Sequence, residues 1–290
     1  MQTGRTAQLV DGRALAATVK KDIRRRVERM EAGGVRPSLH AILVPGDGAA
    51  EIYARNQAKT CAELGIDYVL HELLPTARYE EIAGRVLLLN SDEAANAIMV
   101  HLPLPDGVDT ERIQSLIAVE KDVEGVNPAN IGNIVYGRRS LVPCTALAVM
   151  EMIESTGVAL PGTRCVCVGA SNIVGKPVAV LLMRAEATVI STNVHTSDQG
   201  ALTRTADVLV AAAGVPRLIT ADMVKPGAVV IDVGVNRVAD ADGTMRTVGD
   251  VCFDEVAEVA GHLSPVPGGV GPMTVAMMMR NTVDAVDRPE

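Results

Sequence analysis

The stretch Cys165-Val-Cys-Val-Gly-Ala-Ser-Asn-Ile-Val-Gly-Lys-Pro177 passes from an apolar run through a glycine turn into a segment with proline near its start. This order predicts a buried strand, a tight loop and then a helix, since a first helical turn accepts proline. The free N–H groups at such a helix N-terminus are suited to bind a pyrophosphate. Ser171 stands where the usual Gly-x-Gly-x-x-Gly has its middle glycine, so a plain structural turn remains the alternative.

Strand-like apolar runs alternate with amphipathic helical segments along the rest of the chain. Strands are expected at 39–44, 97–100, 164–168, 188–191, 208–212 and 229–233, and helices at 52–64, 79–90, 144–155 and 274–286. This alternation predicts an α/β protein with parallel sheets. The four strands after Leu160 are typical of a dinucleotide-binding unit, and the segment before Pro143 predicts a second α/β lobe.

Two further segments carry unusual backbone. The run Val229-Val-Ile-Asp-Val-Gly-Val-Asn236 predicts a buried strand that ends in a glycine turn with polar Asp232 and Asn236. The run Pro265-Val-Pro-Gly-Gly-Val-Gly-Pro-Met-Thr274 has three prolines and three glycines in ten residues, so we expect a shaped loop without regular helix or strand. Such a backbone favours the close approach of a ligand over an ordinary connection.

The composition excludes several classes of protein. The net charge of −8 over 290 residues argues against a nucleic-acid partner. No apolar run reaches the length of a membrane span, and the first residues lack the apolar core of a secretory signal, so we expect a cytoplasmic protein. Cys165 and Cys167 face one side of a strand and are expected to be core residues in a reducing compartment, so no metal site is predicted.

Taken together, the segments resemble the bifunctional methylenetetrahydrofolate dehydrogenase/cyclohydrolase family over nearly the whole chain. The matching motifs, in the family's order, are Leu102-Pro-Leu-Pro105, the phosphate loop, Asp232–Asn236, Val248-Gly-Asp-Val251 and Pro265–Thr274. The resemblance implies two lobes with a cleft between them. It assigns 1–142 plus 274–290 to an N-terminal catalytic, folate-binding domain and 143–273 to a Rossmann-like NAD(P)-binding domain. The implied reaction is hydride transfer from 5,10-methylenetetrahydrofolate to the nicotinamide, followed by hydrolysis of the methenyl product.

The resemblance also implies the binding residues. For the cofactor these are Gly169, Ala170, Ser171, Ile173, Val174, Asn193, Ala213, Gly214, Val215, Pro216, Val235 and Asn236. For the folate they are Tyr53, Leu102, Pro103, Glu124, Pro267, Gly268, Gly269 and Pro272.

The choice between NADP and NAD is weakly determined by the residues. The acidic residue that would bind the ribose 2′-OH is missing, and Asn193 is its possible substitute. Only Lys176, His195 and Arg204 could supply charge to a 2′-phosphate, so NADP is expected on family grounds, with NAD possible. A homodimer through the second lobe is also expected, because Thr188–Ser191 would otherwise leave an exposed sheet edge.

The departures from the family pattern lie in the first lobe. Tyr53 is kept, but Gln57 occupies the position of the catalytic lysine. His101 replaces the glutamine that holds this lysine, and Glu124 replaces the folate-binding aspartate. A glutamine has no titratable proton and cannot act as a general acid or base. Hydride transfer mainly requires positioning. With Tyr53, Gln57, His101 and Glu124 as catalytic candidates, we therefore expect a dehydrogenase with weak or lost cyclohydrolase activity.

Other functions remain open from the residues alone. A specialised paralogue could act on another imine, aminal or folate one-carbon adduct, since three polar positions have changed together. The full bifunctional enzyme is possible if His101 replaces the lysine, because imidazole titrates near neutrality, whereas a neutral hydrogen-bonding spacer at His101 would give no such help. The intact loops argue against a non-catalytic binding protein.

Overall fold

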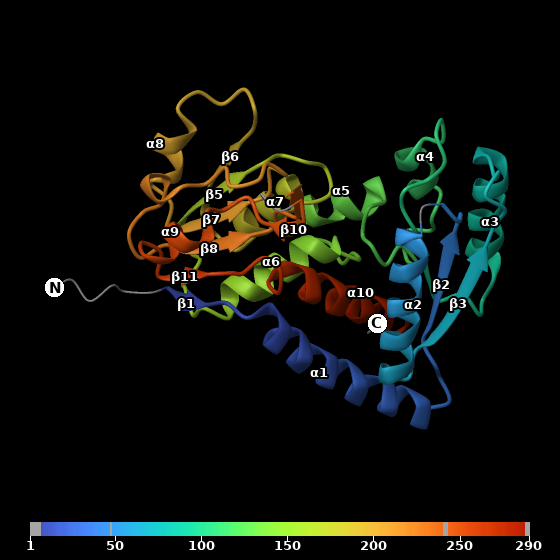
Figure 1. The fold of residues 1–290 in the computed structure, drawn as a ribbon. Helices are drawn as coiled ribbons and strands as arrows, with labels where there is room; N and C mark the ends of the chain where they lie inside the picture. The colour runs from blue at the N-terminus through green and yellow to red at the C-terminus, as the bar shows by residue number, and fades with distance from the viewer. Residues whose placement is uncertain (1–6, 47, 240–242, 288–290) are drawn as a thin grey trace. The chain divides into compact units, whose positions relative to one another are not determined.

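The computed structural model describes residues 7–46, 48–239 and 243–287. The chain forms two compact units, which are drawn in Figure 1: unit 1 consists of Met1–Ala17 and Thr145–Thr274, and unit 2 of Thr18–Cys144 and Val275–Glu290. The divisions fall within three helices, α1 (Gly12–Ala32), α6 (Cys144–Glu154) and α10 (Val270–Val286).

Unit 1 is built on a six-stranded sheet whose strand pairings are all parallel. Its order is β1 (Gln8–Leu9), β11 (His262–Leu263), β8 (Val229–Asp232), β7 (Val208–Ala211), β5 (Arg164–Val168) and β6 (Thr188–Thr192). The chain passes from β5 to β6 on one side and then to β7 on the other. The order of the strands therefore reverses at β5, and such a switch point is where open α/β sheets bind their ligands.

Short helices and a hairpin complete unit 1. Besides its parts of α1, α6 and α10, its helices are α7 (Gly175–Arg184), α8 (Gln199–Thr203), a 3₁₀ turn at Ala221–Met223 and α9 (Phe253–Ala257). An antiparallel pair, β9 (Asn236–Ala239) and β10 (Met245–Val248), follows β8. The core is aliphatic, with β7 and β8 buried at every position, as is usual for a parallel sheet covered on both faces. Cys165 and Cys167 are buried in β5, as expected for core residues.

Unit 2 contains a second parallel sheet of three strands in the order β3 (Asp67–Glu72), β2 (Ser38–Leu43) and β4 (Ala97–Val100). Its helices, besides its parts of α1 and α10, are α2 (Ala49–Leu64), α3 (Tyr79–Ser91), α4 (Thr110–Gln114) and α5 (Pro128–Tyr136). The central strand β2 is buried throughout, whereas the edge strand β3 is largely exposed. One hydrophobic core of this unit is formed mainly by isoleucine, valine, leucine and alanine, with residues of both α3 and β4 among them.

One expectation about the backbone is wrong. The segment Pro265–Thr274 is not a loop throughout, because α10 already begins at Val270. Pro272 lies in the first turn of this helix, where backbone N–H groups have no partner within the helix, so proline removes no hydrogen bond there. The irregular part is limited to the turn around Pro267, Gly268 and Gly269.

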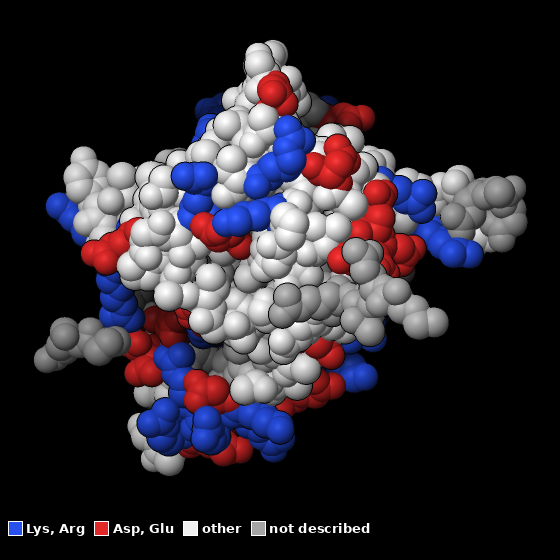
Figure 2. Space-filling view, turned by 90° about the vertical axis from the view of Figure 1, so that its left-hand side faces the viewer, with Lys and Arg blue, Asp and Glu red and all other residues white. Residues whose placement is uncertain are grey.

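The surface carries mixed charge. On the face drawn in Figure 2, basic and acidic side chains are interspersed. On α1, Arg24 pairs with Glu28 and Arg25 with Asp22. Within the described part of the chain, no helix combines the length and the apolar character that a bilayer crossing requires.

Candidate functional site

The predicted cofactor residues follow four neighbouring strands of unit 1. Gly169, Ala170, Ser171, Ile173 and Val174 connect β5 to α7, Asn193 follows β6, the run Ala213–Pro216 follows β7, and Val235 and Asn236 follow β8. The carboxyl ends of parallel strands meet at one edge of a sheet, so the fold brings these loops to the edge at which ligands bind. Their roles in binding stay predictions.

Two glycines allow the backbone to close tightly at the switch point. Gly169 has φ 105°, and a Cβ there would lie 2.1 Å from the carbonyl oxygen of Ala212, at the end of β7. A Cβ on Gly175 would lie 2.0 Å from the carbonyl oxygen of Gly169. No side chain fits at either position. This contact between loops argues for a shaped cradle and against the plain turn that the sequence left open.

Polar side chains near this loop are already engaged. The Ser171 hydroxyl accepts from the N–H groups of Val174 and Gly175 at 3.2 and 3.3 Å. Lys176 Nζ donates to Asn172 Oδ1 at 2.7 Å. Asn193 Oδ1 accepts from the N–H of His195 at 2.9 Å, so its carboxamide holds a local turn.

A pair of buried aspartates organises the same edge, and sequence reasoning gave neither a role in binding. Asp232, the last residue of β8, accepts from the N–H groups of Gly234, Asp250 and Val251 at 2.9 to 3.0 Å. Burial raises the pKa of the Asp232 carboxyl to about 6, against the effect of these hydrogen bonds. We call Asp232 and Asp250 the aspartate clamp. The motif Val248-Gly-Asp-Val251 was the signal that could have drawn attention to it.

In unit 2, helix α2 positions Tyr53 and Gln57 one turn apart. Gln57 is 1% exposed, and its Nε2 donates to the sulfur of Met278 on α10 at 3.0 Å. Within the described chain no donor lies at hydrogen-bond distance from the buried Gln57 Oε1. Desolvation raises the pKa of the Tyr53 hydroxyl to about 12, so it is a neutral donor near pH 7. The position of the family's lysine is therefore occupied by a neutral, buried amide that contacts Met278.

His101 lies directly after β4 and faces two tyrosines. Its Nε2 is 3.2 Å from the hydroxyl of Tyr68, and its ring meets that of Tyr53 edge to face at 5.8 Å between centroids. Burial lowers the pKa of His101 to about 4, so the imidazole is neutral near pH 7. Of the two roles that the sequence left open for His101, this favours a neutral hydrogen-bonding residue over a proton-transferring replacement for the lysine.

The loop that carries Glu124 is fixed from several sides. Asn281 of α10 donates to the carbonyl oxygens of Val123 and Val142 at 2.8 and 2.9 Å. Glu124 Oε2 is buried, with no hydrogen-bond partner among the described residues. Burial, and then the charge of Asp122, raise the pKa of Glu124 to about 7. Buried acceptors without donors are rare in proteins, so the free oxygens of Glu124 and Gln57 are each suited to a ligand that supplies an N–H group.

Lys121, three residues before Glu124, does not replace the missing lysine. Its Nζ donates to three backbone carbonyls, those of Leu89, Asn90 and Asp92, at 3.1, 2.9 and 2.8 Å. All three ammonium protons are therefore used at the C-terminus of α3. The remaining predicted folate residues are divided: Leu102 and Pro103 follow His101 in unit 2, whereas Pro267, Gly268, Gly269 and Pro272 belong to unit 1.

The opposite pKa shifts of His101 and Glu124 predict two opposite pH dependences of the free energy of unfolding, which largely cancel in the wild type. His101, lowered to about 4, contributes stability that is complete above its unfolded pKa of about 6.5 and is lost as the pH falls through 4. Glu124, raised to about 7, contributes stability that is complete below its unfolded pKa and is lost as the pH rises through 7. Each contribution is on the order of 3 kcal/mol.

We therefore expect single variants to expose the two contributions. Relative to wild type, the free energy of unfolding of Glu124→Gln should increase between pH 4.5 and 8. That of His101→Gln should increase as the pH falls from 6.5 to 4. Urea unfolding across this pH range measures both, with the exposed Glu120→Gln as the control carboxyl. Parallel pH curves for wild type and variants would contradict the assignment.

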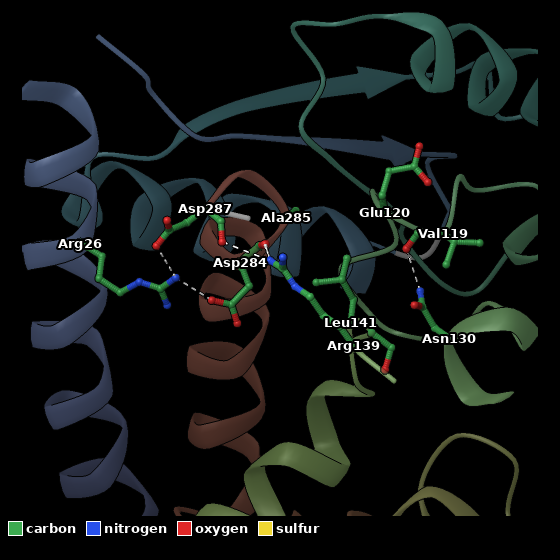
Figure 3. A pocket seen from close by; sticks show the side chains of 10 residues that line it. Arg26, Val119, Glu120, Asn130, Arg139, Leu141, Asp284, Ala285 and Asp287 are labelled. Atoms are coloured by element: carbon green, nitrogen blue, oxygen red, sulfur yellow. Dashed lines mark hydrogen bonds and ion pairs between the residues drawn. The ribbon is translucent and has the colours of Figure 1, made fainter. Parts of the chain in front are cut away.

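A separate cavity of about 680 Å³ in unit 2 contains none of the predicted site residues (Figure 3). Arg26 of α1 bridges Asp284 and Asp287 at 2.7 and 3.0 Å. Arg139 donates to the backbone oxygens of the same two residues at 3.2 Å each. These bonds hold the C-terminal end of α10, and we assign the cavity a structural role.

Comparison with known proteins adds to this geometry. Residues 10–124 match the family description "Tetrahydrofolate dehydrogenase/cyclohydrolase, catalytic domain", and residues 143–290 match "Tetrahydrofolate dehydrogenase/cyclohydrolase, NAD(P)-binding domain". The bifunctional protein FolD of Moorella thermoacetica is 46% identical over 97% of this chain and 99% of its own.

Solved structures agree with the sequence comparisons. The bifunctional FolD of Campylobacter jejuni superimposes with a TM-score of 0.91 at 39% identity, covering 96% of this chain and 98% of its own. The methylenetetrahydrofolate dehydrogenase-cyclohydrolase of Trypanosoma brucei, solved with NADP and an inhibitor, also gives 0.91 at 39% identity, covering 98% of each chain.

Proposed function

The chain belongs to the tetrahydrofolate dehydrogenase/cyclohydrolase family, and on this basis we propose that it oxidises 5,10-methylenetetrahydrofolate to 5,10-methenyltetrahydrofolate. The similar proteins are described as bifunctional, so the further proposal that cyclohydrolase activity is weak or lost rests on this chain's own residues. NADP is the proposed hydride acceptor, with NAD as the alternative. The proposed domains are 1–142 with 274–290 for the folate and 143–273 for the cofactor. They differ from the compact units mainly at the N-terminus, where β1 pairs with β11 and so belongs with the sheet of unit 1.

The loss of hydrolysis rests on Gln57. General acid–base groups contribute about 10²–10⁴-fold to such steps, and a buried glutamine bonded to a methionine sulfur transfers no proton. His101, with its pKa near 4, is too weak a base to substitute near pH 7. Dehydrogenation depends mainly on holding the substrate, for which Tyr53 and Glu124 remain. Glu124, with its pKa near 7, can both donate and accept, which suits the N–H and nitrogen acceptor groups of a pterin.

The cofactor loops support the dehydrogenase step. The cradle at Gly169 and Gly175 brings the loop that leads into α7 to the switch point, which is where open α/β sheets bind their ligands. For the 2′-phosphate, Lys176 and Arg204 are engaged in the structure but lie on the surface, and either could turn toward a phosphate.

The proposal is tested by incubating the purified protein with methylenetetrahydrofolate and NADP or NAD, and identifying the folate product. Accumulation of the methenyl compound is the expected result. Production of 10-formyltetrahydrofolate at the dehydrogenase rate would indicate the full bifunctional enzyme. No hydride transfer with either cofactor would indicate a specialised substrate, an alternative favoured by the joint change at positions 57, 101 and 124.

We further propose a homodimer formed through unit 1. Strand β6 is the last strand in the order of the sheet, and its residues Thr188 and Ser191 are exposed. An unpaired edge favours pairing with a second copy. Sedimentation at micromolar concentration should give twice the monomer mass. Thr188→Lys with Ser191→Lys should shift it to monomer, whereas Leu87→Lys on the exposed face of α3 should not. A monomeric wild type would refute the proposal.

A further inference from the structure

Asp250 joins the loops that follow two neighbouring strands of unit 1. Its Oδ2 accepts from the N–H groups of Ala213 and Gly214, after β7, at 2.7 and 2.9 Å. Its Oδ1 accepts from Nδ2 of Asn236, after β8, at 2.9 Å. The Asp250 side chain is fully buried, and all three of its partners are neutral donors. One carboxylate thus fixes both loops at the edge where the dinucleotide is proposed to bind.

The carboxylate itself has little freedom. Asp232 Oδ1 accepts from the backbone N–H of Asp250 at 3.0 Å, so the clamp holds its second member through the first. A Cβ on Gly234 would lie 2.1 Å from Asp250 Oδ1, and one on Gly249 would lie 1.8 Å from Asp232 Oδ2. Both carboxylates therefore pack directly on backbone that admits no side chain.

This arrangement decides which way the Asn236 amide points. A carboxylate only accepts hydrogen bonds, so the NH₂ group of Asn236 must face Asp250 and the amide oxygen must point away. The N–H groups of Ala213 and Gly214 are also used by Asp250, so they cannot bind phosphate. Asn236 therefore presents a hydrogen-bond acceptor at this edge of the sheet.

We propose that Asp250 is a positioning residue that orients the Asn236 amide so that its oxygen accepts from the hydroxyl or carboxamide groups of the nicotinamide half of the dinucleotide. The inference rests on the proposed function, because it takes a dinucleotide as the ligand. It assigns recognition of the adenine half to other residues.

The test exchanges the polarity of the pair. In Asp250→Asn, the oxygen of the new amide can still accept from the N–H groups of Ala213 and Gly214. Its NH₂ group, however, faces the NH₂ group of Asn236. The Asn236 amide must therefore rotate, and it then presents NH₂ instead of oxygen to the ligand. NADP should bind about tenfold more weakly, as for one hydrogen bond inverted in a buried site. Asn236→Asp alone places two carboxylates together and should also weaken binding. The double variant restores a donor–acceptor pair with an outward oxygen, and should return to within about threefold of wild type.

Titration calorimetry with NADP and with 2′,5′-ADP, which carries only the adenine half, reads the effect without folate or turnover. Asp254→Asn, an exposed carboxyl on α9, is the matched control and should bind both probes as wild type does. Equal weakening of both probes by Asp250→Asn, or a double variant no better than that single one, would overturn the proposal. Unfolding midpoints confirm that each variant is folded.

Failure of the proposed function gives a different result. If the wild type binds neither NADP nor NAD, the dinucleotide function is wrong, whatever Asp250 does. The side-chain amide resonances of Asn236 in cofactor-free protein then test the positioning alone. They should differ between the wild type and Asp250→Asn. Unchanged resonances would refute the orientation of Asn236 by Asp250.

Discussion

Replacing Gly169 by alanine should weaken NADP binding at least 100-fold, or prevent unit 1 from folding. The new Cβ would lie 2.1 Å from the carbonyl oxygen of Ala212, and the residue has φ 105°, a conformation that alanine rarely adopts. Relief requires β5 and β7 to separate at their carboxyl ends, and this distorts the loop proposed to bind the dinucleotide. Titration calorimetry with NADP and urea unfolding together measure the effect.

The control variant Gly162→Ala distinguishes the effect of a close contact from the effect of a positive φ angle. Gly162 has φ 76°, also positive, but a Cβ there meets nothing within 4 Å. We expect this variant to lose on the order of 1 kcal/mol of stability, and to keep its affinity for NADP. Equal behaviour of the two alanine variants would show that positive φ alone, and not the approach of two loops, makes Gly169 necessary.

Restoring the lysine at position 57 should raise conversion of methenyl- to 10-formyltetrahydrofolate by about 100-fold or more, provided its neighbours are restored with it. In the single variant Gln57→Lys, the ammonium group would be buried beside the sulfur of Met278, where desolvation lowers its pKa. Combining it with His101→Gln and Glu124→Asp gives the lysine the neighbours of the family pattern. The three effects should be strongly non-additive.

The rate of methenyl hydrolysis, followed separately from hydride transfer, is the measurement. Asn56→Lys adds the same charge one position away, on the exposed side of α2, and should change neither step. The prediction fails if the wild type already hydrolyses the methenyl compound as fast as it forms it. A triple variant that hydrolyses no faster than wild type, while folded and active as a dehydrogenase, would also contradict it.

The parts of the fold with a strong periodic pattern were predictable. The strands at 97–100 and 164–168 match in full, because their apolar runs end at polar or glycine residues. Helix α1 was not expected, since ten of its 21 residues are charged and its second half has only four apolar residues, Ile23, Val27, Met30 and Ala32. Strand β3 was missed because it is an exposed edge strand whose pairing depends on β2, a contact distant in sequence.

The candidate site was predictable where a motif carries it, and not where burial decides the chemistry. Gly169 and Gln57 stand out in sequence because of their positions in known patterns. The neutral state of His101 follows from its burial in the folded protein, which the sequence pattern around it does not indicate. The three carbonyls bound by Lys121 likewise come together only when α3 ends beside its side chain.

The separate sheets and cores of the two units have a consequence for divergence. The hydrogen bonds described above for Gln57 and His101, and the contacts of the loop that carries Glu124, are all made within unit 2. Those of the aspartate clamp and the glycine cradle are made within unit 1. Substitutions near Gln57, His101 and Glu124 can therefore accumulate without breaking the hydrogen bonds that fix the proposed dinucleotide-binding loops of unit 1. After a gene duplication, one copy can therefore change its substrate specificity and still bind the same nicotinamide cofactor.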